Sequence, residues 1–336
     1  DFMSQPSVVI TNKPYHETID FLSPHCSVRS NTGIEIWSDD EMTAQLNGAV
    51  AMMAFMPDSV DDGFLVRCPD LKLISCALKG YDNFDLEACS RRGVMVAFVP
   101  DLLTIPTAEL AVGLTIGLAR NVRAGDAHVR SGAFDGWRAH LYGKGLDGSL
   151  VGLLGAGAVG KATAARLAGF GCRIQYFDSV PLSPGEAQQY NMTAVSVDDL
   201  LATSDYVIAC LPLNPATLHL VNAEAIAHMK PGAHLINISR GSVVEETAVA
   251  DALESEHLAG YAADVFELED WALPERPRNV EPRLLAPDAP TVFTPHIGSG
   301  VVQVRMEIER QAAHHIVQFL SGETPDGAIN AKEISA

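Results

Sequence analysis

Positive charge is scarce in this chain, which has 23 lysines and arginines against 42 aspartates and glutamates and a formal net charge of −19. A surface that binds nucleic acid needs clustered cations, so we expect no nucleic acid partner. No apolar stretch reaches the roughly 18 uncharged residues that a membrane span requires. No basic segment followed by an apolar one opens the sequence, as it would in a secretory signal. The expectation is a cytoplasmic protein with no membrane association.

Cysteine is sparse too, and its spacing argues against a structural metal site or a redox motif. The chain has six cysteines, with no CxxC pair among them. No cluster of cysteine, histidine or carboxylate has the spacing of metal ligands. We therefore expect reduced thiols and no metal. The cysteines are Cys26, Cys68, Cys76, Cys89, Cys172 and Cys210.

Short apolar runs alternate with segments of helical period along most of the chain, which is typical of α/β folds with parallel sheets. A length of 336 residues and a hydrophobic fraction of 47% favour two domains. Residues 106–129 predict one long helix with Pro106 in its first turn, and residues 301–320 predict another. We expect two open parallel-sheet domains with a cleft between them. The expected strands are 7–11, 49–55, 72–78, 94–100, 150–155, 173–178, 206–212, 234–239, 260–266 and 290–296.

A glycine-rich segment, Gly155-Ala-Gly157-Ala-Val-Gly160, directly follows an expected strand and opens a helical segment. The first glycine permits a tight turn, the second lets backbone approach a pyrophosphate, and the third packs helix against strand. Asp178 ends the next expected strand, 18 residues after Gly160. A carboxylate there accepts hydrogen bonds from ribose hydroxyls and repels a 2′-phosphate, and no arginine follows it. The sequence predicts a Rossmann-type site for NAD rather than NADP, with a plain surface aspartate as the alternative at Asp178.

Three polar residues follow three different expected strands of the second domain. Arg240 follows the strand at 234–239, Glu269 lies just past the strand at 260–266, and His296 ends the strand at 290–296. Ligands of open α/β sheets bind outside the carboxyl ends of the strands. An arginine grips an anion with a planar fork of donors, a histidine moves a proton near neutral pH, and a glutamate orients that histidine. Taken singly, these residues could be a surface ion pair, a solvated carboxylate and a core histidine. Together they predict an active site.

Several segments of the sequence resemble the D-2-hydroxyacid dehydrogenase family, and the similarity covers nearly the whole chain. The resemblance implies two Rossmann-like domains. Residues 3–102 and 300–330 form a substrate-binding, flavodoxin-like domain, and residues 103–299 form the NAD-binding domain. It implies catalytic roles for Arg240, Glu269 and His296 and a homodimer through the 106–129 helix region. The segments are GAGAVG (155–160), ISRGSVVEETAVADAL (238–253), DVFELED (264–270), TPHIGS (294–299) and ALKGYDNFDLEACSRRGV (77–94).

The resemblance also implies a set of residues that contact the cofactor. These belong mainly to the glycine-rich turn and to the loops that follow the strands of the second domain. They are Lys79, Thr107, Gly155, Ala156, Gly157, Ala158, Val159, Gly160, Asp178, Leu211, Pro212, Ser239, Arg240, Asp264, His296 and Gly298.

Lys79 departs from the pattern of members that act on hydroxy acids, which usually carry a small or apolar residue there. With AMMAFMPD (51–58), VPDLLTIPTAELA (99–111), GWRAHLYG (136–143) and FELEDWA (266–272), it resembles members that oxidise phosphite. Phosphite is largely dianionic near neutral pH, so a second cation beside Arg240 improves the charge match. Lys79 could instead be a solvated loop lysine or serve the cofactor. The implied pocket comprises Met56, Lys79, Gly80, Trp137, Tyr142, Arg240, Ser299 and Arg305.

The expected reaction is phosphite + NAD⁺ + water → phosphate + NADH + H⁺. We assign proton transfer to His296, oriented by Glu269, and anion binding to Arg240 and Lys79; Arg240 is a conceivable rival base. Two alternatives stay open. One is a D-2-hydroxyacid dehydrogenase that reduces glyoxylate or hydroxypyruvate with the same three residues. The other is a non-enzymatic NAD-sensing corepressor, against which the retention of all three residues argues.

Overall fold

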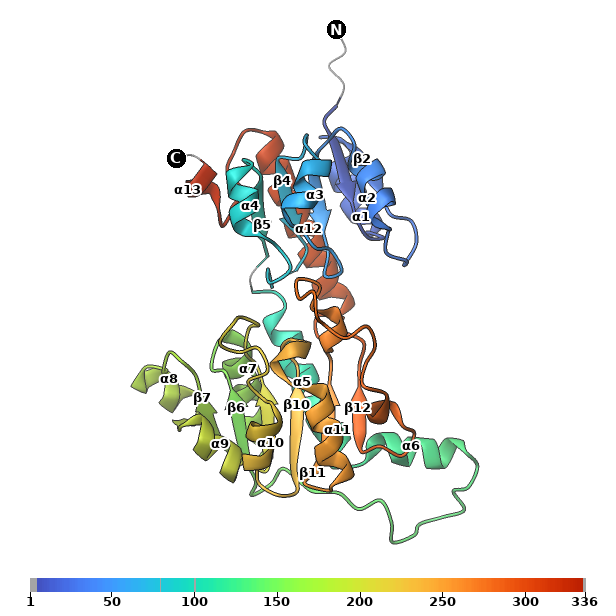
Figure 1. Ribbon diagram of the computed structural model, residues 1–336, viewed down its shortest axis with the longest axis vertical. Helices are drawn as coiled ribbons and strands as arrows, with labels where there is room; N and C mark the ends of the chain where they lie inside the picture. Colours follow the sequence, from blue (N-terminus) through green and yellow to red (C-terminus); the bar gives the residue numbers. More distant parts are fainter. Residues whose placement is uncertain (1–4, 79, 100, 335–336) are drawn as a thin grey trace. The chain divides into compact units, whose positions relative to one another are not determined.

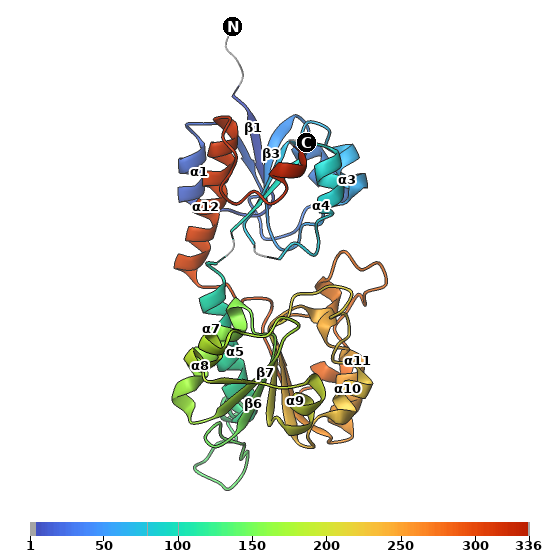
Figure 2. The same ribbon diagram turned by 90° about the vertical axis from the view of Figure 1, so that its left-hand side faces the viewer.

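The computed structural model describes residues 5–78, 80–99 and 101–334 and divides into two compact units. One unit holds the described residues up to Leu103 together with those from Gly300 onward, and the other spans Thr104–Ser299. Each unit is an α/β layer structure in which all strand pairs of the described residues are parallel (Figures 1 and 2). Lys79, a predicted site residue, lies outside the described residues.

The first unit has a five-stranded sheet in the order β2-β1-β3-β4-β5. Its strands are β1 (Ser7–Ile10), β2 (Ser27–Ser30), β3 (Ala49–Ala54), β4 (Leu73–Cys76) and β5 (Met95–Phe98). The sheet separates two apolar cores: α1 and α12 cover one face, and α2, α3 and α4 cover the other (Figure 2). The helices are α1 (His16–Leu22), α2 (Asp39–Leu46), α3 (Asp62–Arg67), α4 (Leu86–Arg91), α12 (Val302–Leu320) and α13 (Ala331–Ile334).

The second unit has a seven-stranded sheet in the order β12-β11-β10-β9-β6-β7-β8. The order reverses between β6 and β9, which is the switch point where doubly wound sheets bind dinucleotides. Helices α5 and α7 cover one face, and α9, α10 and α11 cover the other (Figure 2). The strands are β6 (Leu150–Leu154), β7 (Arg173–Phe177), β8 (Met192–Ala194), β9 (Tyr206–Ala209), β10 (Ala233–Asn237), β11 (Leu258–Ala263) and β12 (Thr291–Phe293). The helices are α5 (Thr104–Ala119), α6 (Val122–Arg130), α7 (Ala158–Leu167), α8 (Pro184–Gln189), α9 (Val197–Thr203), α10 (Ala223–His228) and α11 (Glu246–Glu254).

The prediction of two parallel-sheet α/β domains is confirmed, but two details of the predicted elements are wrong. Strands β2 and β8 are absent from the predicted strands, because they are short and partly polar. The single helix predicted over 106–129 is two helices, α5 and α6, because Asn121 adopts a left-handed conformation with φ 52°. Its side-chain amide donates to the carbonyls of Leu141 and Tyr142. Asparagine tolerates this conformation better than most residues, so the chain turns there.

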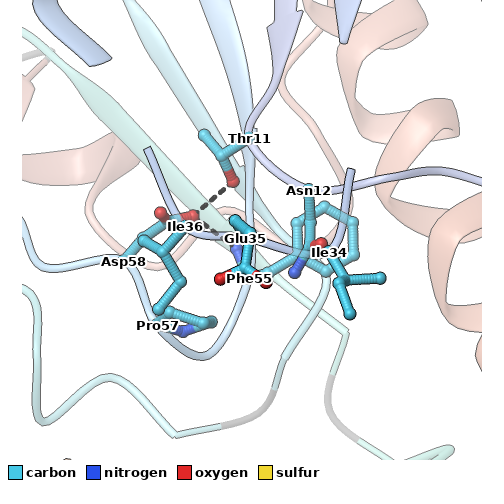
Figure 3. A pocket seen from close by; sticks show the side chains of 8 residues that line it. All are labelled: Thr11, Asn12, Ile34, Glu35, Ile36, Phe55, Pro57 and Asp58. Atoms are coloured by element: carbon cyan, nitrogen blue, oxygen red, sulfur yellow. Dashed lines mark hydrogen bonds between the residues drawn. The ribbon is translucent and has the colours of Figure 1, made fainter. Parts of the chain in front are cut away.

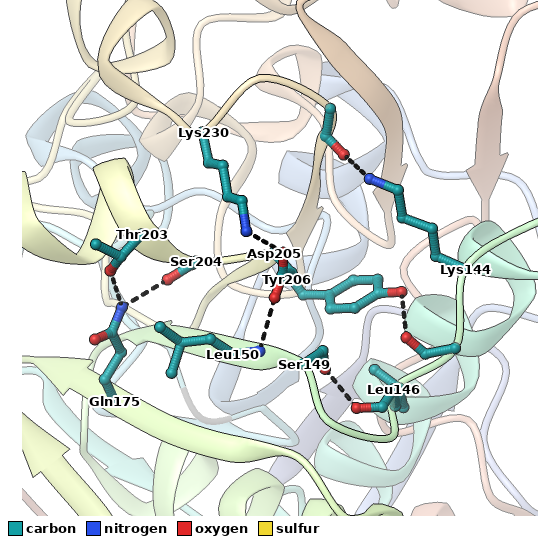
Figure 4. Close-up of polar contacts among 12 residues, drawn as sticks. Lys144, Leu146, Ser149, Leu150, Gln175, Thr203, Ser204, Asp205, Tyr206 and Lys230 are labelled. Atoms are coloured by element: carbon teal, nitrogen blue, oxygen red, sulfur yellow. Dashed lines mark hydrogen bonds and ion pairs between the residues drawn. The ribbon is translucent and has the colours of Figure 1, made fainter.

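Polar contacts tie the amino-terminal edge of the second sheet together (Figure 4). The Lys144 ammonium donates to the Gly232 carbonyl just before β10, and the Tyr206 hydroxyl donates to the Gly145 carbonyl. Asp205 accepts from Lys230 at 2.7 Å and from the Leu150 backbone at 2.9 Å. These contacts anchor the end of the segment 131–146, here called the arm, at the edge of the sheet opposite the carboxyl ends of the strands.

No helix within the described ranges combines the length and the apolar character that a bilayer span requires. The six cysteines are free thiols, four of them buried.

The first unit contains a buried carboxylate beside a small pocket at the point where its strand order reverses, between β1 and β3 (Figure 3). Asp58 is 6% exposed and accepts hydrogen bonds from the Thr11 hydroxyl at 2.5 Å and the Phe55 backbone at 2.7 Å. Burial raises the pKa of Asp58 from 3.8 to about 6 despite these bonds. The carboxylate therefore fastens the loop after β3 to the loop after β1.

Asp58 gives the first unit a specific dependence of stability on pH. Because the pKa is higher in the folded state, its contribution is fully present below 3.8 and is lost as the pH rises through about 6. A rise in the pKa of Asp58 from 3.8 to about 6 corresponds to a loss of about 3 kcal/mol. Urea unfolding from pH 3.5 to 7.5 should show a difference between wild type and Asp58→Asn that changes by about this amount. The exposed Asp70→Asn is the control, and a constant difference between wild type and Asp58→Asn would contradict the assignment.

Candidate active site

The glycine-rich turn of the second unit has the geometry of a pyrophosphate cradle. Gly155 has φ 103°, and a Cβ there would lie 2.9 Å from the Cys210 carbonyl oxygen. A Cβ on Gly160 would lie 2.2 Å from the Gly155 carbonyl oxygen, so α7 packs directly on the turn. Gly157, the N-cap of α7, is exposed and has no atom within 4 Å of its Cβ position among the described residues. The turn is therefore closed beneath and open above, where backbone N–H groups at the helix start bind anions.

Asp178, at the end of β7, is bonded to this turn. One carboxylate oxygen accepts from the Ala156 backbone at 2.8 Å, and the other accepts from Val180 at 2.9 Å. A carboxylate has about four acceptor positions, so two bonds leave capacity for ribose hydroxyls. The cradle and the carboxylate fit a dinucleotide whose ribose carries no 2′-phosphate.

A second buried carboxylate, Asp264, organises the loop after β12. It is 2% exposed and accepts from the Thr294 hydroxyl at 2.6 Å and from the Ile297 and Gly298 backbones at 2.8 Å. Burial raises the pKa of Asp264 above its ordinary value, although these donors and nearby His296 act in the opposite direction. A Cβ on Gly298 would lie 3.1 Å from Asp264 and 3.2 Å from Thr107. The structure thus brings together Thr107, Asp264 and Gly298, three of the predicted cofactor contacts.

Glu269 and His296 form a direct pair at the carboxyl edge of the same sheet. The Nδ1 atom of His296 lies 2.6 Å from the Oε2 atom of Glu269, and each side chain is about one quarter exposed, at 25% and 26%. The other oxygen of Glu269 accepts from the Phe266 backbone at 2.9 Å. His296 adopts φ 56°, and its backbone N–H donates to the Asp264 carbonyl. Since a carboxylate only accepts, Nδ1 carries the proton, which leaves Nε2 as the atom that exchanges a proton with a ligand.

Arg240 joins this edge through its own backbone. It follows β10, and its carbonyl accepts from the buried Asn237 amide at 2.9 Å. The next residue, Gly241, starts the 3₁₀ turn η2 (Gly241–Val243), which packs on the turn η3 (Glu267–Glu269). A Cβ on Gly241 would lie 1.8 Å from the Phe266 carbonyl carbon. The segments that carry Arg240 and Glu269 therefore touch backbone to backbone.

The remaining predicted pocket residues lie away from this edge or on the other unit. The carbonyls of Leu141 and Tyr142 bind Asn121 at the end of α5, so the arm that carries Trp137 and Tyr142 leaves from the opposite edge of the sheet. These two side chains are 75% and 71% exposed. The structure does not bring them to Arg240 of the same chain, and their place in the pocket stays a prediction.

In the first unit, Arg305 of α12 donates to the Ala77 carbonyl at 3.3 Å, and its guanidinium lies 5.9 Å from the centre of the Phe55 ring. It thus contacts the loops that hold Met56 and Gly80, both partly buried. Ser299, 5% exposed, ends the second unit. The roles of these residues also stay predictions.

Sequence reasoning missed the residues that hold the site in place. Asn237, Glu246, Glu267 and Asp270 are all buried, with exposed fractions of 0%, 2%, 7% and 2%. In the sequence, the three acidic ones look like ordinary solvated carboxylates. Gly241, immediately after Arg240, is a sequence feature that could have indicated this packing, since a close approach of two backbones is one reason for a glycine beside a functional residue.

Comparison with known proteins agrees with this geometry. The profile of the family described as "D-isomer specific 2-hydroxyacid dehydrogenase, NAD binding domain" matches residues 112–298, more than half of the chain. The chain belongs to this family. It is an NAD-dependent dehydrogenase.

Its relatives are named for different substrates. A protein named glyoxylate reductase from Thermofilum pendens is 33% identical over 99% of this chain and 96% of its own. A D-3-phosphoglycerate dehydrogenase from Mycobacterium bovis is 32% identical over 98% of this chain and 59% of its own. Among solved structures, a 2-hydroxyacid dehydrogenase from Ketogulonicigenium vulgare matches with a TM-score of 0.80 and 29% identity, over 97% of this chain and 99% of its own.

Replacing His296 with alanine should lower kcat by about 10²- to 10⁴-fold, the usual contribution of a general acid–base group. NADH affinity, measured by fluorescence titration, should change little, because most of the predicted cofactor contacts lie at the glycine-rich turn, at Asp178 and in other loops rather than at the His296 side chain. Glu269→Gln should have a milder effect on kcat. It should also move the acid limb of the pH–rate profile, because the carboxylate that stabilises the protonated imidazole of His296 is then missing. His228→Ala, which removes a surface histidine, is the matched control. Near-normal turnover of His296→Ala would place the acid–base group elsewhere.

Proposed function

We propose that the chain transfers a hydride between NAD and a small anion bound at Arg240, with His296 as the acid–base residue. The 2.6 Å hydrogen bond between Glu269 and His296 carries this proposal. It fixes the protonated nitrogen of the imidazole and leaves Nε2 as the atom that exchanges a proton with the substrate. An arginine guanidinium can grip an anion with a planar pair of donors. That of Arg240 also donates from Nη1 to the Ser239 carbonyl at 2.9 Å. When bound, NAD accepts or supplies the hydride.

A 2-keto acid and the corresponding 2-hydroxy acid are the first substrate pair. The relatives named glyoxylate reductase support glyoxylate, since they are 30–34% identical to this chain over 88–99% of its length. A carboxylate carries one charge, which a single bidentate arginine matches. In the reducing direction, His296 donates a proton to the oxygen that was the keto group. In the oxidising direction, it takes that proton back.

Phosphite is the second candidate, and Lys79 favours it. Lys79 follows β4 in the sequence, and the family resemblance implies that members acting on hydroxy acids usually carry a small or apolar residue at this position. The dianion needs a second local cation, because the chain's net charge of −19 repels anions at long range. In phosphite (phosphonate) dehydrogenase chemistry, the P–H bond breaks, a P–O bond to water forms, and one proton is released. His296 would take that proton, while Arg240 and Lys79 hold the anion.

We also propose that the protein is a homodimer through the region of α5, α6 and the arm. None of the residues of α6 is buried in the chain alone. Val122, Val129, Phe134, Trp137 and Tyr142 are between 52% and 75% exposed on this region. Exposed apolar side chains that gather on one surface are typical of protein–protein interaction sites.

Two absorbance assays at 340 nm separate the substrates. One follows NADH formation from NAD⁺ with phosphite, and the other follows NADH loss with glyoxylate. Turnover of a keto acid alone supports the first candidate, and turnover of phosphite alone supports the second. A chain that turns over neither substrate, nor hydroxypyruvate, would contradict the proposed activity.

Lys79→Ala sharpens the distinction. If Lys79 neutralises a dianion, its loss should raise the KM for phosphite by at least about tenfold, and more as the pH rises from 6 to 8. The KM for glyoxylate should change much less. Lys72→Ala, an exposed lysine before β4, is the matched control. An unchanged KM for phosphite across this pH range would remove the role of Lys79.

The dimer is tested by light scattering coupled to size exclusion. Wild type should elute at twice the mass of the chain. Val129→Asp with Phe134→Asp should give a monomer, because burial of each apolar side chain contributes about 1.5–3 kcal/mol. Ile34→Asp, which charges an exposed apolar residue of the first unit, is the control. A wild-type monomer would overturn the proposal.

A further inference from the structure

His219 stands where three segments of the candidate active site meet. It adopts φ 48°, and its backbone N–H donates to the Ser242 carbonyl of η2 at 2.7 Å. Its Nε2 atom lies 2.6 Å from the Oε1 atom of Glu267, the first residue of η3. Since the carboxylate accepts, Nε2 is the donor. One residue thus contacts both the turn after Arg240 and the turn that carries Glu269.

The third segment is the turn that precedes His219. The Thr217 hydroxyl donates to the Pro212 carbonyl at 2.6 Å, and the Asn214 side chain accepts from the Ala216 and Thr217 backbones. These bonds close residues 212–218 into a compact turn after β9. Leu211 and Pro212 at its start are predicted cofactor contacts. His219 fixes the other end of this turn.

The Glu267 carboxylate is buried, and among the described residues no lysine or arginine forms an ion pair with it. It is 7% exposed, and its second oxygen accepts from the Glu246 backbone at 3.1 Å. Glu246, 2% exposed, accepts in return from the Glu267 backbone at 2.8 Å. Burial raises the pKa of Glu246. Two neighbouring buried carboxylates are costly unless donors satisfy them, and the imidazole of His219 is the side-chain donor to Glu267.

We propose that His219 is a positioning residue of the dehydrogenase reaction, a role that rests on the proposed function. By holding Glu267 it fixes η3, and with it Glu269, against the turn that carries Arg240. His219 bonds to Ser242 and Glu267 and reaches His296 and Arg240 only through these neighbours. Other titratable or charged groups near the contact include Glu246, Tyr261, Asp270 and Glu281. Arg276 also lies there, and its guanidinium donates to the Leu268 carbonyl of η3 at 3.0 Å.

Two substitutions at His219 separate the side-chain bond from the backbone conformation. Glutamine places an amide donor near the position of Nε2 but tolerates positive φ poorly. Asparagine tolerates positive φ well but is too short to reach Glu267. If the bond to Glu267 positions η3, His219→Asn should lower kcat by at least about tenfold, and His219→Gln should retain most of it. The KM for NAD should rise less than kcat falls.

The pH–rate profile supplies the readout that a merely structural role would not move. His219→Asn should displace the acid limb in the same direction as Glu269→Gln, because both weaken the support of His296. Glu267→Gln should reproduce the effect, and the double variant His219→Asn/Glu267→Gln should be no worse than the single ones. His16→Asn, which breaks an exposed histidine–aspartate pair of 2.8 Å, should change nothing.

The outcomes distinguish this inference from the proposed function. If the wild-type protein turns over neither phosphite nor a keto acid, the proposed function is wrong, and so is this inference. If the wild-type protein is active but His219→Asn has a normal kcat and an unchanged pH–rate profile, only the positioning role is overturned. The positioning role is also overturned if asparagine outperforms glutamine, or if a destabilised variant shows wild-type kcat per folded molecule.

Discussion

The absence of a side chain at Gly241 is the constraint on which the candidate active site depends. A Cβ at this position would lie 1.8 Å from the Phe266 carbonyl carbon, so only glycine lets the two backbones meet. This contact sets the turn after Arg240 directly on the turn that carries Glu269. The Ser242 backbone then donates to the Asp270 carboxylate at 2.7 Å. The backbone N–H groups of Glu246 and Glu267 each donate to the carboxylate of the other residue. The backbones that carry Arg240 and Glu269 are thereby held against each other by direct packing.

The parts of the fold that could be predicted from the sequence are those that correspond to continuous apolar runs. The central strands of both sheets are apolar runs, and parallel strands bring their carboxyl ends to one edge, so Arg240, Glu269 and His296 could be assigned to that edge in advance. Strands β2 and β8 carry polar residues on short segments and gave no such pattern. The break at Asn121 depends on two distant carbonyls, which no local pattern shows.

The buried carboxylates that support the site could not be predicted from the sequence, for a different reason. Glu246, Glu267 and Asp270 are acidic residues in an acidic chain, and composition makes them look solvated. Their burial is a property of tertiary packing, because each is satisfied by backbone donors far away in sequence. Family membership explains why the three catalytic candidates were recognisable, but it leaves the substrate open. Relatives of similar identity carry the names of enzymes for glyoxylate and for D-3-phosphoglycerate. The information that distinguishes one substrate from another is therefore local to the site and is not given by overall identity.

The proposed chemistry depends on a hydride that passes directly between NAD and an anion held at Arg240. Its most direct test uses a substrate deuterated at the transferred position, either the phosphorus of phosphite or C2 of a 2-hydroxy acid, with mass spectrometry of the reduced cofactor. Direct transfer predicts one deuterium in each reduced nicotinamide. We also expect Arg240→Ala to slow this transfer by about a hundredfold, because the anion loses its orientation. Reduced cofactor without deuterium, or undiminished transfer by Arg240→Ala, would contradict the proposed chemistry.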